Sequence, residues 1–387
     1  MSEKREEKGG MRQGQVKVLH LISSRGLYGA ERIVVNLTAA TDRERFTPSL
    51  ALLQAAGKPN TELIEAIEEK QAKTHVVPSR RWVDLDAVRQ IKQLVREEGI
   101  DLIHCHEMKG RLYGLLAARG TKARAMTTHH NWIRSDFLVT CFENFDGFYL
   151  RFFPKIVAVS QEVRQLMHRY LISDKKIEVI INGIDMQEFR RDQAARERIR
   201  QEFGIAPETP LIGTFGRLSP EKGQKHLITA AEQVLKTCPE ARFLLVGDGF
   251  QGEEMREYAA SLGIAEQVIF AGFRKDVAQL YSALDIFVLP SLLEGTPMAL
   301  LEAMATALPA ISSEVGGVGR IIEDGVNGLL VPPAEPEQLA AAILRLVKDR
   351  AEAERLAKQA LVTIAERYSA QRMAEAYMQV YEELLEE

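Results

Sequence analysis

The chain alternates between short apolar runs rich in β-branched residues and segments whose apolar positions recur every three or four residues. VKVLHLI, PSLALLQ and IDLIHCH have the length of strands, whereas GAERIVVNLTAA and LDAVRQIKQLVREE follow the period of an amphipathic helix. Strands that alternate with helices predict a mostly parallel sheet, because parallel neighbours need a crossover connection. The first half therefore predicts a doubly wound α/β domain, closed by KIVAVS, a helix over 161–170 and IEVIINGID.

The same alternation begins again with the apolar run PLIGTFG and predicts a second doubly wound domain. The elements that follow are a helix over 223–236, ARFLLVGDG, a helix over 252–262, QVIFAG, DIFVLP, LPAISS and GLLVPP. We expect a flexible leader over 1–14, a first domain over 15–190, a linker over 191–207, a second domain over 208–367 and a terminal helix over 368–387. Ser369 is suited to cap that helix after a break at Tyr368, and the pattern leaves open whether the helix returns to the first domain.

No apolar run approaches the roughly 20 residues that a membrane-spanning helix needs. The charged leader also lacks the apolar core of a secretory signal, so we expect a cytoplasmic protein. The three cysteines, Cys105, Cys141 and Cys238, are widely spaced and form no Cys-x-x-Cys. This spacing argues against a disulfide framework or a structural zinc site.

Charge is distributed unevenly along the chain. Residues 1–190 carry 30 Lys and Arg against 24 Asp and Glu, a net +6, and residues 191–387 carry 20 against 30, a net −10. A basic half suits an anionic acceptor or the headgroups of an anionic membrane, although chance variation in surface composition explains it equally well. No basic cluster is interleaved with aromatic residues at stacking spacing, so we expect no nucleic-acid partner.

Two loops that follow predicted strands carry the strongest candidate chemistry, because ligands of open α/β sheets bind beyond the carboxyl ends of the strands. In LIGTFGRLSPEKGQKH, Arg217 and Lys222 lie between Gly216 and Gly223. Arginine grips a diphosphate with two hydrogen bonds and lysine adds a point charge, so the pair suits a nucleoside diphosphate. Two solvent-exposed cations are the alternative interpretation.

The second loop lies in DIFVLPSLLEGTPMALLEAMA, where a strand ends at Pro290 and Glu294 precedes a helix. Thr296 and Pro297 predict the start of that helix, whose amide groups and dipole favour a phosphate. Glu302 is expected two turns into the helix, where it would reach another part of the same ligand. A capped helix with a solvated glutamate is the alternative.

These motifs together resemble one family over nearly the whole chain. They are Gly216-Arg217, Glu221-Lys222-Gly223, Glu294-Gly295-Thr296-Pro297 and Glu302-Ala303-Met304-Ala305, with Tyr28-Gly29-Ala30-Glu31, Thr127-Thr128-His129-His130, Val159-Ser160 and Asn182-Gly183-Ile184-Asp185 in the first half. They resemble the retaining family 4 glycosyltransferases of GT-B fold, in which two Rossmann-like domains face each other across a cleft. The family usually has Gly-Gly where this chain has Tyr28-Gly29.

The resemblance implies roles for particular residues. Arg217 and Lys222 would hold the diphosphate of the donor, Glu294 would contact the transferred sugar, and Glu302 would contact the ribose. Gly29, Gly216, Gly295, Thr296 and Pro297 would complete the donor site, and His130 would be the histidine of the cleft. The resemblance thus implies a catalytic set of His130, Arg217, Lys222 and Glu294.

The same resemblance implies a hexosyltransferase that retains the anomeric configuration and needs no metal ion or other cofactor. Its substrates would be a nucleotide-sugar, by default a UDP-sugar, and a glycan, lipid-linked or small-molecule acceptor. Cell-surface polysaccharide or glycolipid synthesis is the expected role. No carboxylate of the sequence is clearly placed as a nucleophile for double displacement, which favours front-face displacement.

Two histidine pairs follow predicted strands. His129 and His130 point to opposite sides of an extended chain, so only one faces the cleft, and we assign His130 to it while His129 stays open. His104 and His106 share a face and resemble a metal-binding pair, but no third ligand is spaced nearby. We therefore expect no metal and a structural or cleft-lining role for His106.

Two other functions remain open. Gly247, Gly249 and Gly252 fit G-x-G-x-x-G, the fingerprint of an NAD-dependent oxidoreductase, although that fingerprint follows the first strand of its domain and PLIGTFG precedes it here. In a glycosyltransferase, Gly247 and Gly249 would instead line the cleft. A catalytically inactive sugar-binding relative is the second alternative. Asp84-Leu85-Asp86 resembles a metal-binding D-x-D motif, but we interpret Asp84 as a helix cap.

Residues 132–155 contain an unusual density of aromatic side chains between basic residues. They are Trp132, Phe137, Phe142, Phe145, Phe148, Tyr149, Phe152 and Phe153. From Phe142 onward their spacings of three and four fit one face of a buried helix. Peripheral contact with an anionic membrane at the inner face is the other interpretation.

Overall fold

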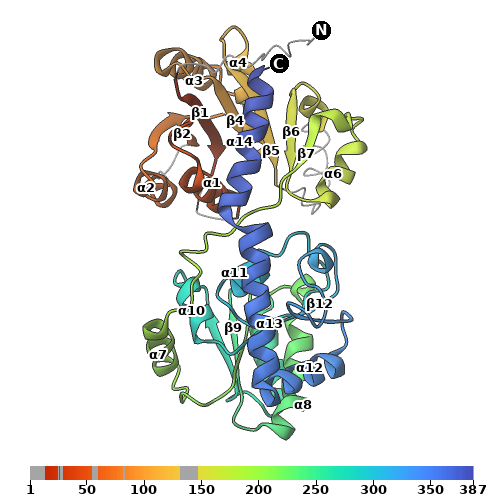
Figure 1. The fold of residues 1–387 in the computed structure, drawn as a ribbon. Coiled ribbons are helices and arrows are strands. Elements are labelled where there is room, and N and C mark those ends of the chain that lie inside the picture. The colour runs from red at the N-terminus through yellow and green to blue at the C-terminus, as the bar shows by residue number, and fades with distance from the viewer. Residues whose placement is uncertain are drawn as a thin grey trace, which may run out of the picture. The chain divides into compact units, whose positions relative to one another are not determined.

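The computed structural model describes residues 14–386 except 25, 27–28, 55–59, 82 and 131–146. Its contacts divide the chain into two compact units, the first formed by residues up to Ile180 and from Ala374 onward, the second by Ile181–Met373. Each unit contains one parallel sheet flanked by helices (Figure 1). The predicted pair of doubly wound α/β domains is confirmed. All of the expected leader except Gly14 lies outside the described residues.

The first unit has a seven-stranded sheet in the order β3-β2-β1-β4-β5-β6-β7, with parallel pairing throughout. Its strands are β1 (Val16–Ser23), β2 (Phe46–Gln54), β3 (Lys73–Pro78), β4 (Leu102–Cys105), β5 (Arg124–His129), β6 (Lys155–Ala158) and β7 (Ile177–Val179). Its helices include α1 (Gly29–Ala40), α2 (Thr61–Glu69), α3 (Leu85–Glu98), α4 (Glu107–Ala118) and α6 (Gln161–His168). The strand order reverses between β1 and β4, so the loops after these two strands flank a topological switch point.

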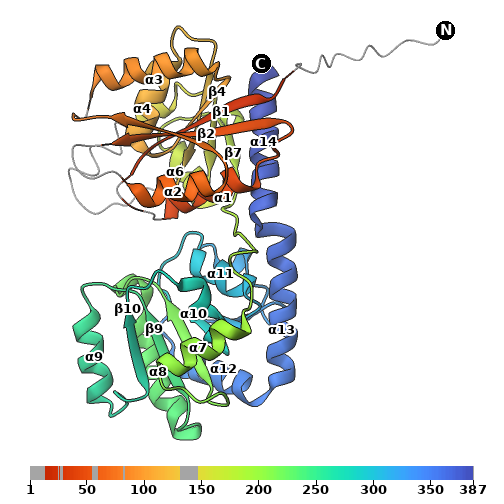
Figure 2. The ribbon, with the colours of Figure 1, turned by 90° about the vertical axis from the view of Figure 1, so that its left-hand side faces the viewer.

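The second unit has a six-stranded parallel sheet in the order β10-β9-β8-β11-β12-β13. Its strands are β8 (Leu211–Phe215), β9 (Arg242–Val246), β10 (Val268–Gly272), β11 (Ile286–Leu289), β12 (Ala310–Ser313) and β13 (Leu329–Val331). Its helices are α7 (Gln193–Glu202), α8 (Gln224–Thr237), α9 (Gly252–Ser261), α10 (Val277–Ala283), α11 (Met298–Ala305), α12 (Pro336–Lys348) and α13 (Arg350–Thr363) (Figure 2). Here the order reverses between β8 and β11, the strands that precede the Arg217 and Glu294 loops.

The C-terminal segment breaks where the sequence predicts. After a π-helical turn over Ile364–Tyr368, Ser369 is extended, with φ −74° and ψ 153°, and helix α14 (Ala370–Glu386) begins. The Ser369 hydroxyl accepts a hydrogen bond from the amide of Arg372 at 3.3 Å, which confirms the predicted cap. From Ala374 onward the helix belongs to the first unit, where it lies across the central strands of the sheet (Figures 1 and 2).

The predicted linker over 191–207 contains a helix. Asp192 caps α7 by accepting from the amides of Ala194 and Ala195, and α7 packs against α10 within the second unit. The contacts divide the chain after Ile180 rather than after residue 190. Asp84 caps α3 as predicted, accepting from the amides of Asp86 and Ala87. Within the described part of the chain, no helix is long and apolar enough to cross a membrane.

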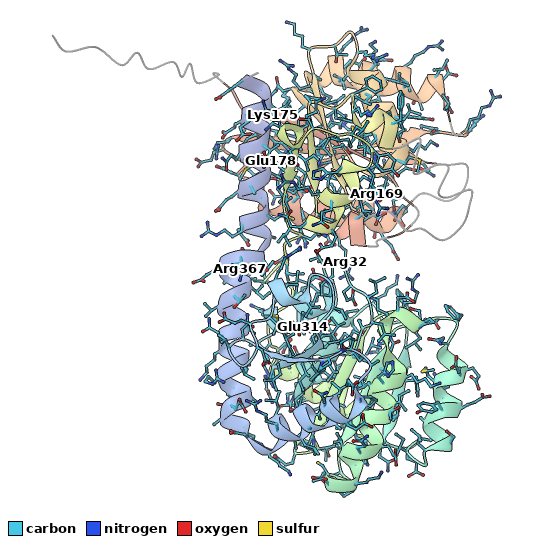
Figure 3. All side chains as sticks on the ribbon, turned by 90° about the vertical axis from the view of Figure 1, so that its right-hand side faces the viewer. Arg32, Arg169, Lys175, Glu178, Glu314 and Arg367 are labelled. Carbon is cyan, nitrogen blue, oxygen red and sulfur yellow. The ribbon has the colours of Figure 1, made fainter. Side chains whose placement is uncertain are left out.

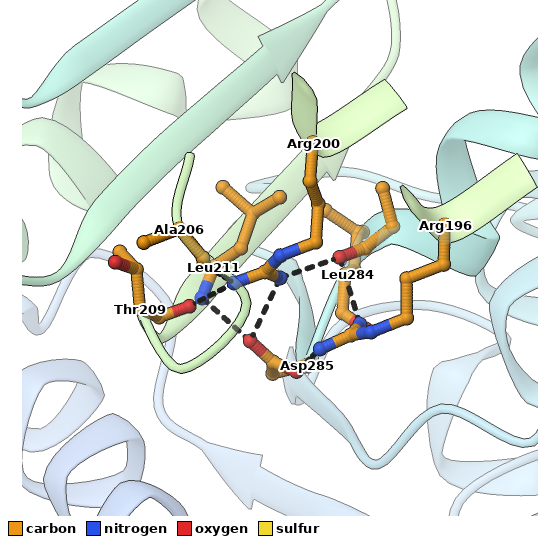
Figure 4. A network of polar contacts seen from close by, with 8 residues as sticks. Arg196, Arg200, Ala206, Thr209, Leu211, Leu284 and Asp285 are labelled. Atoms are coloured by element: carbon orange, nitrogen blue, oxygen red, sulfur yellow. Dashed lines mark hydrogen bonds and ion pairs between the residues drawn. The ribbon is translucent and has the colours of Figure 1, made fainter. Parts of the chain in front are cut away.

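A polar network joins α7 to the start of the two strands that precede the candidate donor loops (Figure 4). Asp285 comes directly before β11; its Oδ1 pairs with Arg196 at 2.7 Å and its Oδ2 with Arg200 at 3.3 Å. Asp285 Oδ2 also accepts from the amide of Leu211 at 2.8 Å, and its own amide donates to the Leu211 carbonyl at 2.9 Å. One carboxylate therefore fixes β8, β11 and α7 to one another.

Asp285→Ala should destabilise the second unit by about 3 kcal/mol, because it leaves the buried Arg200 without its carboxylate partner. Urea denaturation followed by circular dichroism measures the change in unfolding free energy. Glu232→Ala is the matched control, since it removes a pair at 2.8 Å with Lys236, whose side chain is 67% exposed, and should cost less than about 0.5 kcal/mol. Equal small effects in both variants would show that the network adds no stability.

Candidate functional site

The two loops singled out in the second half of the sequence contact each other directly. Lys222 Nζ lies 2.8 Å from Glu294 Oε1, which also accepts a hydrogen bond from the Ser291 hydroxyl at 2.7 Å. The Glu294 side chain is only 7% exposed, whereas that of Lys222 is 27% exposed. A cation and a carboxylate held side by side can meet the charged and the hydroxyl-bearing parts of one ligand.

Backbone contacts at glycines hold these loops together. A Cβ added to Gly223 would lie 2.1 Å from the Pro290 carbonyl oxygen, and one added to Gly316 would lie 1.9 Å from the Glu294 carbonyl oxygen. Both residues also have positive φ, 64° and 50°, which strains any other residue. The loops after β8, β11 and β12 therefore meet at distances that only glycine permits.

Arg217 follows Gly216 at the end of β8 and extends into solvent. Its side chain is 66% exposed, and Nη2 lies 3.1 Å from Glu221 Oε1. Hydrogen bonds from Ser219 and from the backbone, with the Arg217 guanidinium nearby, hold the pKa of Glu221 below its ordinary value. Because an exposed ion pair contributes little, Arg217 can exchange Glu221 for an anionic ligand at small cost.

Helix α11 begins later than the sequence predicts. Pro297 is extended, with ψ 101°, and acts as the N-cap, so Met298 rather than Thr296 or Pro297 starts the helix. Glu302 is therefore about one turn into α11, not two, and its Oε2 accepts from the Tyr281 hydroxyl at 2.9 Å. Gly295 is exposed, and a Cβ there would meet nothing within 4 Å. The loop before α11 is thus open to a ligand.

Gly247 and Gly249 lie beside the Arg217 loop, after β9. A Cβ on Gly247 would be 2.0 Å from the Gly216 carbonyl oxygen, and one on Gly249 would be 2.2 Å from that of Leu218. These contacts explain why glycine stands at both positions. The backbone of the neighbouring loop fills the space that a dinucleotide fingerprint leaves for a pyrophosphate, which disfavours the oxidoreductase alternative.

The first unit brings together histidines from its three central strands. His20 on β1 is opposite His104 on β4, and its Nδ1 lies 3.2 Å from His106 Nε2. His106 Nδ1 in turn lies 3.2 Å from Nε2 of His130, which follows β5. His104 points to the same face, where its ring nitrogens contact the Tyr381 hydroxyl at 2.8 Å and the Thr128 hydroxyl at 2.7 Å.

The expectation that no third ligand lies near His104 and His106 is wrong. His20, 84 residues before His104 in the sequence numbering, offers a nitrogen within 4.8 Å of theirs, and among the described residues these three could hold a metal ion. His104 and His106, however, each use both ring nitrogens in the contacts above. Only the pairing of β1 with β4 brings His20 into place, so sequence spacing gives no signal for it.

His129 and His130 differ in burial as their alternation predicts. His129 is the last residue of β5 and is fully buried, while His130 is partly exposed and contacts His106. Gly29 opens α1, and a Cβ there would meet nothing within 4 Å. Tyr28 lies outside the described residues.

The aromatic segment divides between core and surface. Tyr149 and Phe153 are buried, whereas Phe148 and Phe152 are each 54% exposed, with ring centroids 5.7 Å apart. The prediction that these side chains share one helical face is therefore wrong. Phe148 and Phe152 are four residues apart on an exposed row, and Tyr149 and Phe153 are four residues apart on a buried row beside it. Trp132, Phe137, Phe142 and Phe145 lie outside the described residues.

Two family models match the chain, one in each half. The model described as Glycosyltransferase Family 4 matches residues 28–188, and the model described as Glycosyl transferases group 1 matches residues 195–362. In Escherichia coli, the UDP-Gal:alpha-D-GlcNAc-diphosphoundecaprenol alpha-1,3-galactosyltransferase is 24% identical over 345 residues, 87% of this chain and 89% of the relative. The D-inositol 3-phosphate glycosyltransferase of Nocardia farcinica is 34% identical over 205 residues, 50% of this chain and 45% of the relative.

Solved structures share the fold along almost the whole chain. Anabaena HepE in complex with UDP-glucose is 25% identical, with a TM-score of 0.78, and the match covers 95% of this chain and 100% of that one. A glycosyltransferase from Rickettsia africae is 20% identical, with a TM-score of 0.81, over 96% of this chain and 99% of that one.

Four histidines that are buried or partly buried make the first unit sensitive to acid. Burial lowers the pKa of His20 and of His130 to about 3 and holds the pKa of His104 and of His106 well below the ordinary value. An unfolded histidine titrates near pH 6.5, so below this pH the unfolded chain binds protons that the folded chain does not. Stability is therefore retained above pH 6.5 and lost as the pH falls toward 3.

We expect each of these imidazoles to remove about 1.4 kcal/mol of unfolding free energy per pH unit once the pH is well below 6.5. In His20→Gln the dependence on pH should become shallower by about one proton. Urea denaturation followed by circular dichroism between pH 7.5 and 5 measures these slopes. Tyr381→Phe removes a buried hydroxyl but no imidazole and should keep the wild-type slope; an unchanged slope in His20→Gln would contradict the assignment.

Proposed function

Because the chain belongs to glycosyltransferase family 4, has the GT-B fold and transfers a sugar from a nucleotide donor, we propose that it is a retaining, metal-independent hexosyltransferase. The observation that carries the proposal is the contact between Lys222 and Glu294 at 2.8 Å. It joins a cation suited to a diphosphate to a carboxylate suited to sugar hydroxyls. A donor whose phosphates meet Lys222 therefore has its hexose beside Glu294.

The donor diphosphate would bind between Arg217, Lys222 and the start of α11. Arg217 is exposed and exchanges its partner at small cost, and Gly295 and Thr296 leave the backbone before Met298 accessible. The first amides of a helix have no partner within the helix and attract phosphate oxygens. Glu302, one turn further along α11, would bind the ribose hydroxyls.

Transfer would proceed at the front face of the anomeric carbon. The bond from that carbon to the diphosphate oxygen breaks while the bond to the acceptor oxygen forms, and the proton of the acceptor hydroxyl passes to the departing phosphate. Arg217, Lys222 and the amides of α11 stabilise the charge that develops on the leaving group. Two protein cations supply the charge that a divalent metal supplies in other transferases, which supports metal independence.

The names of the relatives suggest the substrates. The galactosyltransferase of E. coli is named for UDP-Gal and a diphosphoundecaprenol-linked GlcNAc, and HepE was solved with UDP-glucose. We therefore favour a UDP-hexose donor and a lipid-linked glycan acceptor, as in the synthesis of a cell-surface polysaccharide or glycolipid. Intact Arg217, Lys222 and Glu294 argue against an inactive sugar-binding relative.

The first unit has a surface suited to such an acceptor. Phe148, Phe152 and Leu171, which we call the aromatic patch, are exposed, and Arg151 links the two segments by donating to the Tyr170 carbonyl at 2.7 Å. Arg169 and Lys175 project from the same unit (Figure 3). Exposed rings on a unit that also carries exposed basic side chains suit the interface of an anionic membrane on the cytoplasmic side.

Arg217→Ala and Lys222→Ala should each lose about a hundredfold or more of the transfer rate, because one group facing the leaving diphosphate is worth about 2 to 4 kcal/mol. The assay is transfer from UDP-hexose to a lipid-linked glycan, and NMR of the product should show the anomeric configuration of the donor. Lys225→Ala, an exposed cation on α8 paired with Glu254 at 4.0 Å, is the control and should retain activity.

Calorimetry with UDP alone separates the two glutamates. Glu302→Gln should weaken UDP binding, while Glu294→Gln should weaken mainly the binding of the intact UDP-hexose.

In the transfer assay, near-wild-type turnover of both Arg217→Ala and Lys222→Ala would contradict the diphosphate assignment. A product with inverted anomeric configuration would contradict retention.

Phe148→Ser together with Phe152→Ser should reduce sedimentation with vesicles that contain anionic phospholipid, and added salt should release the wild-type protein by screening. Both side chains are more than half exposed, so the double variant should keep its circular dichroism spectrum and thermal midpoint. Leu171→Ser extends the series, and Val362→Ser, an exposed apolar residue of the second unit, is the control. Wild-type protein that stays in the supernatant at low salt would refute membrane contact.

A further inference from the structure

The three central strands of the first sheet carry imidazoles on one face. Register pairs His20 with His104, and side chains two residues apart on a strand share a face, which adds His106. His130, after β5, joins the same face through its contact with His106. Helix α14 covers this face with Tyr381, which bonds His104.

Three of these rings form a line of contacts that ends near the surface. His20 Nδ1 meets His106 Nε2, and His106 Nδ1 meets His130 Nε2, both at 3.2 Å. The rings of His106 and His130 are stacked, with centroids 5.5 Å apart. His20 and His106 are buried, whereas His130 is partly exposed. We call these residues the histidine chain.

Counting protons leaves the histidine chain two arrangements. Burial keeps the three rings neutral, so each carries one N–H proton. Each contact between rings needs one donor and one acceptor, which uses two of the three protons. The third lies at one end, on His130 Nδ1 or on His20 Nε2. Since each ring has a single proton, the choice at either end fixes all three tautomers.

We propose that His20 and His106 are positioning residues that decide, through the histidine chain, whether His130 Nδ1 donates or accepts the hydrogen bond to a hydroxyl-bearing sugar ligand. The proposal rests on the proposed function and takes His130, the cleft histidine that the family resemblance implies, as a contact of the sugar ligand. The histidine chain uses Nε2 of His130 and leaves Nδ1 for a ligand. A residue on β1, 110 positions earlier in the numbering, thus sets the polarity of a binding group after β5.

Nitrogen-15 NMR of the histidine side chains at pH 7.5 tests the coupling without any ligand. His20→Gln, His106→Gln and His130→Gln assign the resonances. We expect all three rings to carry their proton on the same nitrogen, either all on Nδ1 or all on Nε2. Mixed tautomers would overturn the proposal, because two lone pairs or two N–H groups would then face each other across one contact.

Transfer kinetics test the consequence for the reaction. His106→Phe keeps a ring but removes both contacts and should lower kcat/KM about tenfold, the value of one lost hydrogen bond, mainly through KM. His106→Gln, whose amide both donates and accepts, should recover part of the loss. His104→Gln is the matched control: it lies on the same face but bonds Thr128 and Tyr381, so kcat/KM should stay near wild type.

The two arms separate the proposal from the proposed function. A single shared tautomer with no detectable transfer by the wild-type protein would overturn the proposed function and, with it, the role of His130 toward a sugar. Normal transfer with a wild-type kcat/KM in His106→Phe would overturn the proposal alone. One equivalent of zinc bound to His20, His104 and His106 in the purified protein would also overturn it, because a coordinated nitrogen neither donates nor accepts a hydrogen bond.

Discussion

The candidate donor site depends on three loops of the second unit approaching one another backbone to backbone. The space beside Gly223 and Gly316 is occupied by carbonyl oxygens of the Glu294 loop, so any side chain there would push the loops apart. This approach is what brings Lys222 within 2.8 Å of Glu294. The chemistry of the site is therefore carried by charged residues, but its geometry is set by residues that have no side chain.

Asp285 supplies the complementary constraint at the opposite ends of the same strands. Asp285 directly precedes β11 and is hydrogen-bonded to Leu211, the first residue of β8. The two strands therefore begin in a fixed register. Because both strands are short and run parallel, a fixed start determines where each one ends. The Arg217 and Glu294 loops then emerge as neighbours at the switch point of the sheet. Glycine contacts act at one end of this pair of strands, and the partly buried ion pairs of Asp285 act at the other.

Local sequence signals predicted the fold and the positions of the two candidate loops well. Alternating strand and helix periods indicated two parallel sheets, and the loops holding Arg217, Lys222 and Glu294 follow apolar strands within a few residues. Features that depend on pairing between distant segments could not be predicted. His20 joins His106 only because β1 pairs with β4, and no local pattern reports that register. The sequence also could not show that Phe148 is exposed. A spacing of four fits two neighbouring rows of side chains, and it does not say which row packs inward.

Sequence analysis left open whether the terminal helix returns to the first domain, because the answer depends on contacts between distant segments. His104 and Thr128 are buried polar residues of the first sheet, and their partners Tyr377 and Tyr381 come from α14, about 250 residues or more away in the numbering. Buried polar groups cost free energy unless they are hydrogen-bonded. The hydroxyls of Tyr377 and Tyr381 therefore stabilise the first sheet by pairing with its buried polar side chains. Lys155 repeats the pattern, since its buried ammonium pairs with Glu383 of α14 at 3.0 Å. The first unit is thus incomplete as residues 15–190 alone, and α14 belongs to it by polar chemistry as well as by packing.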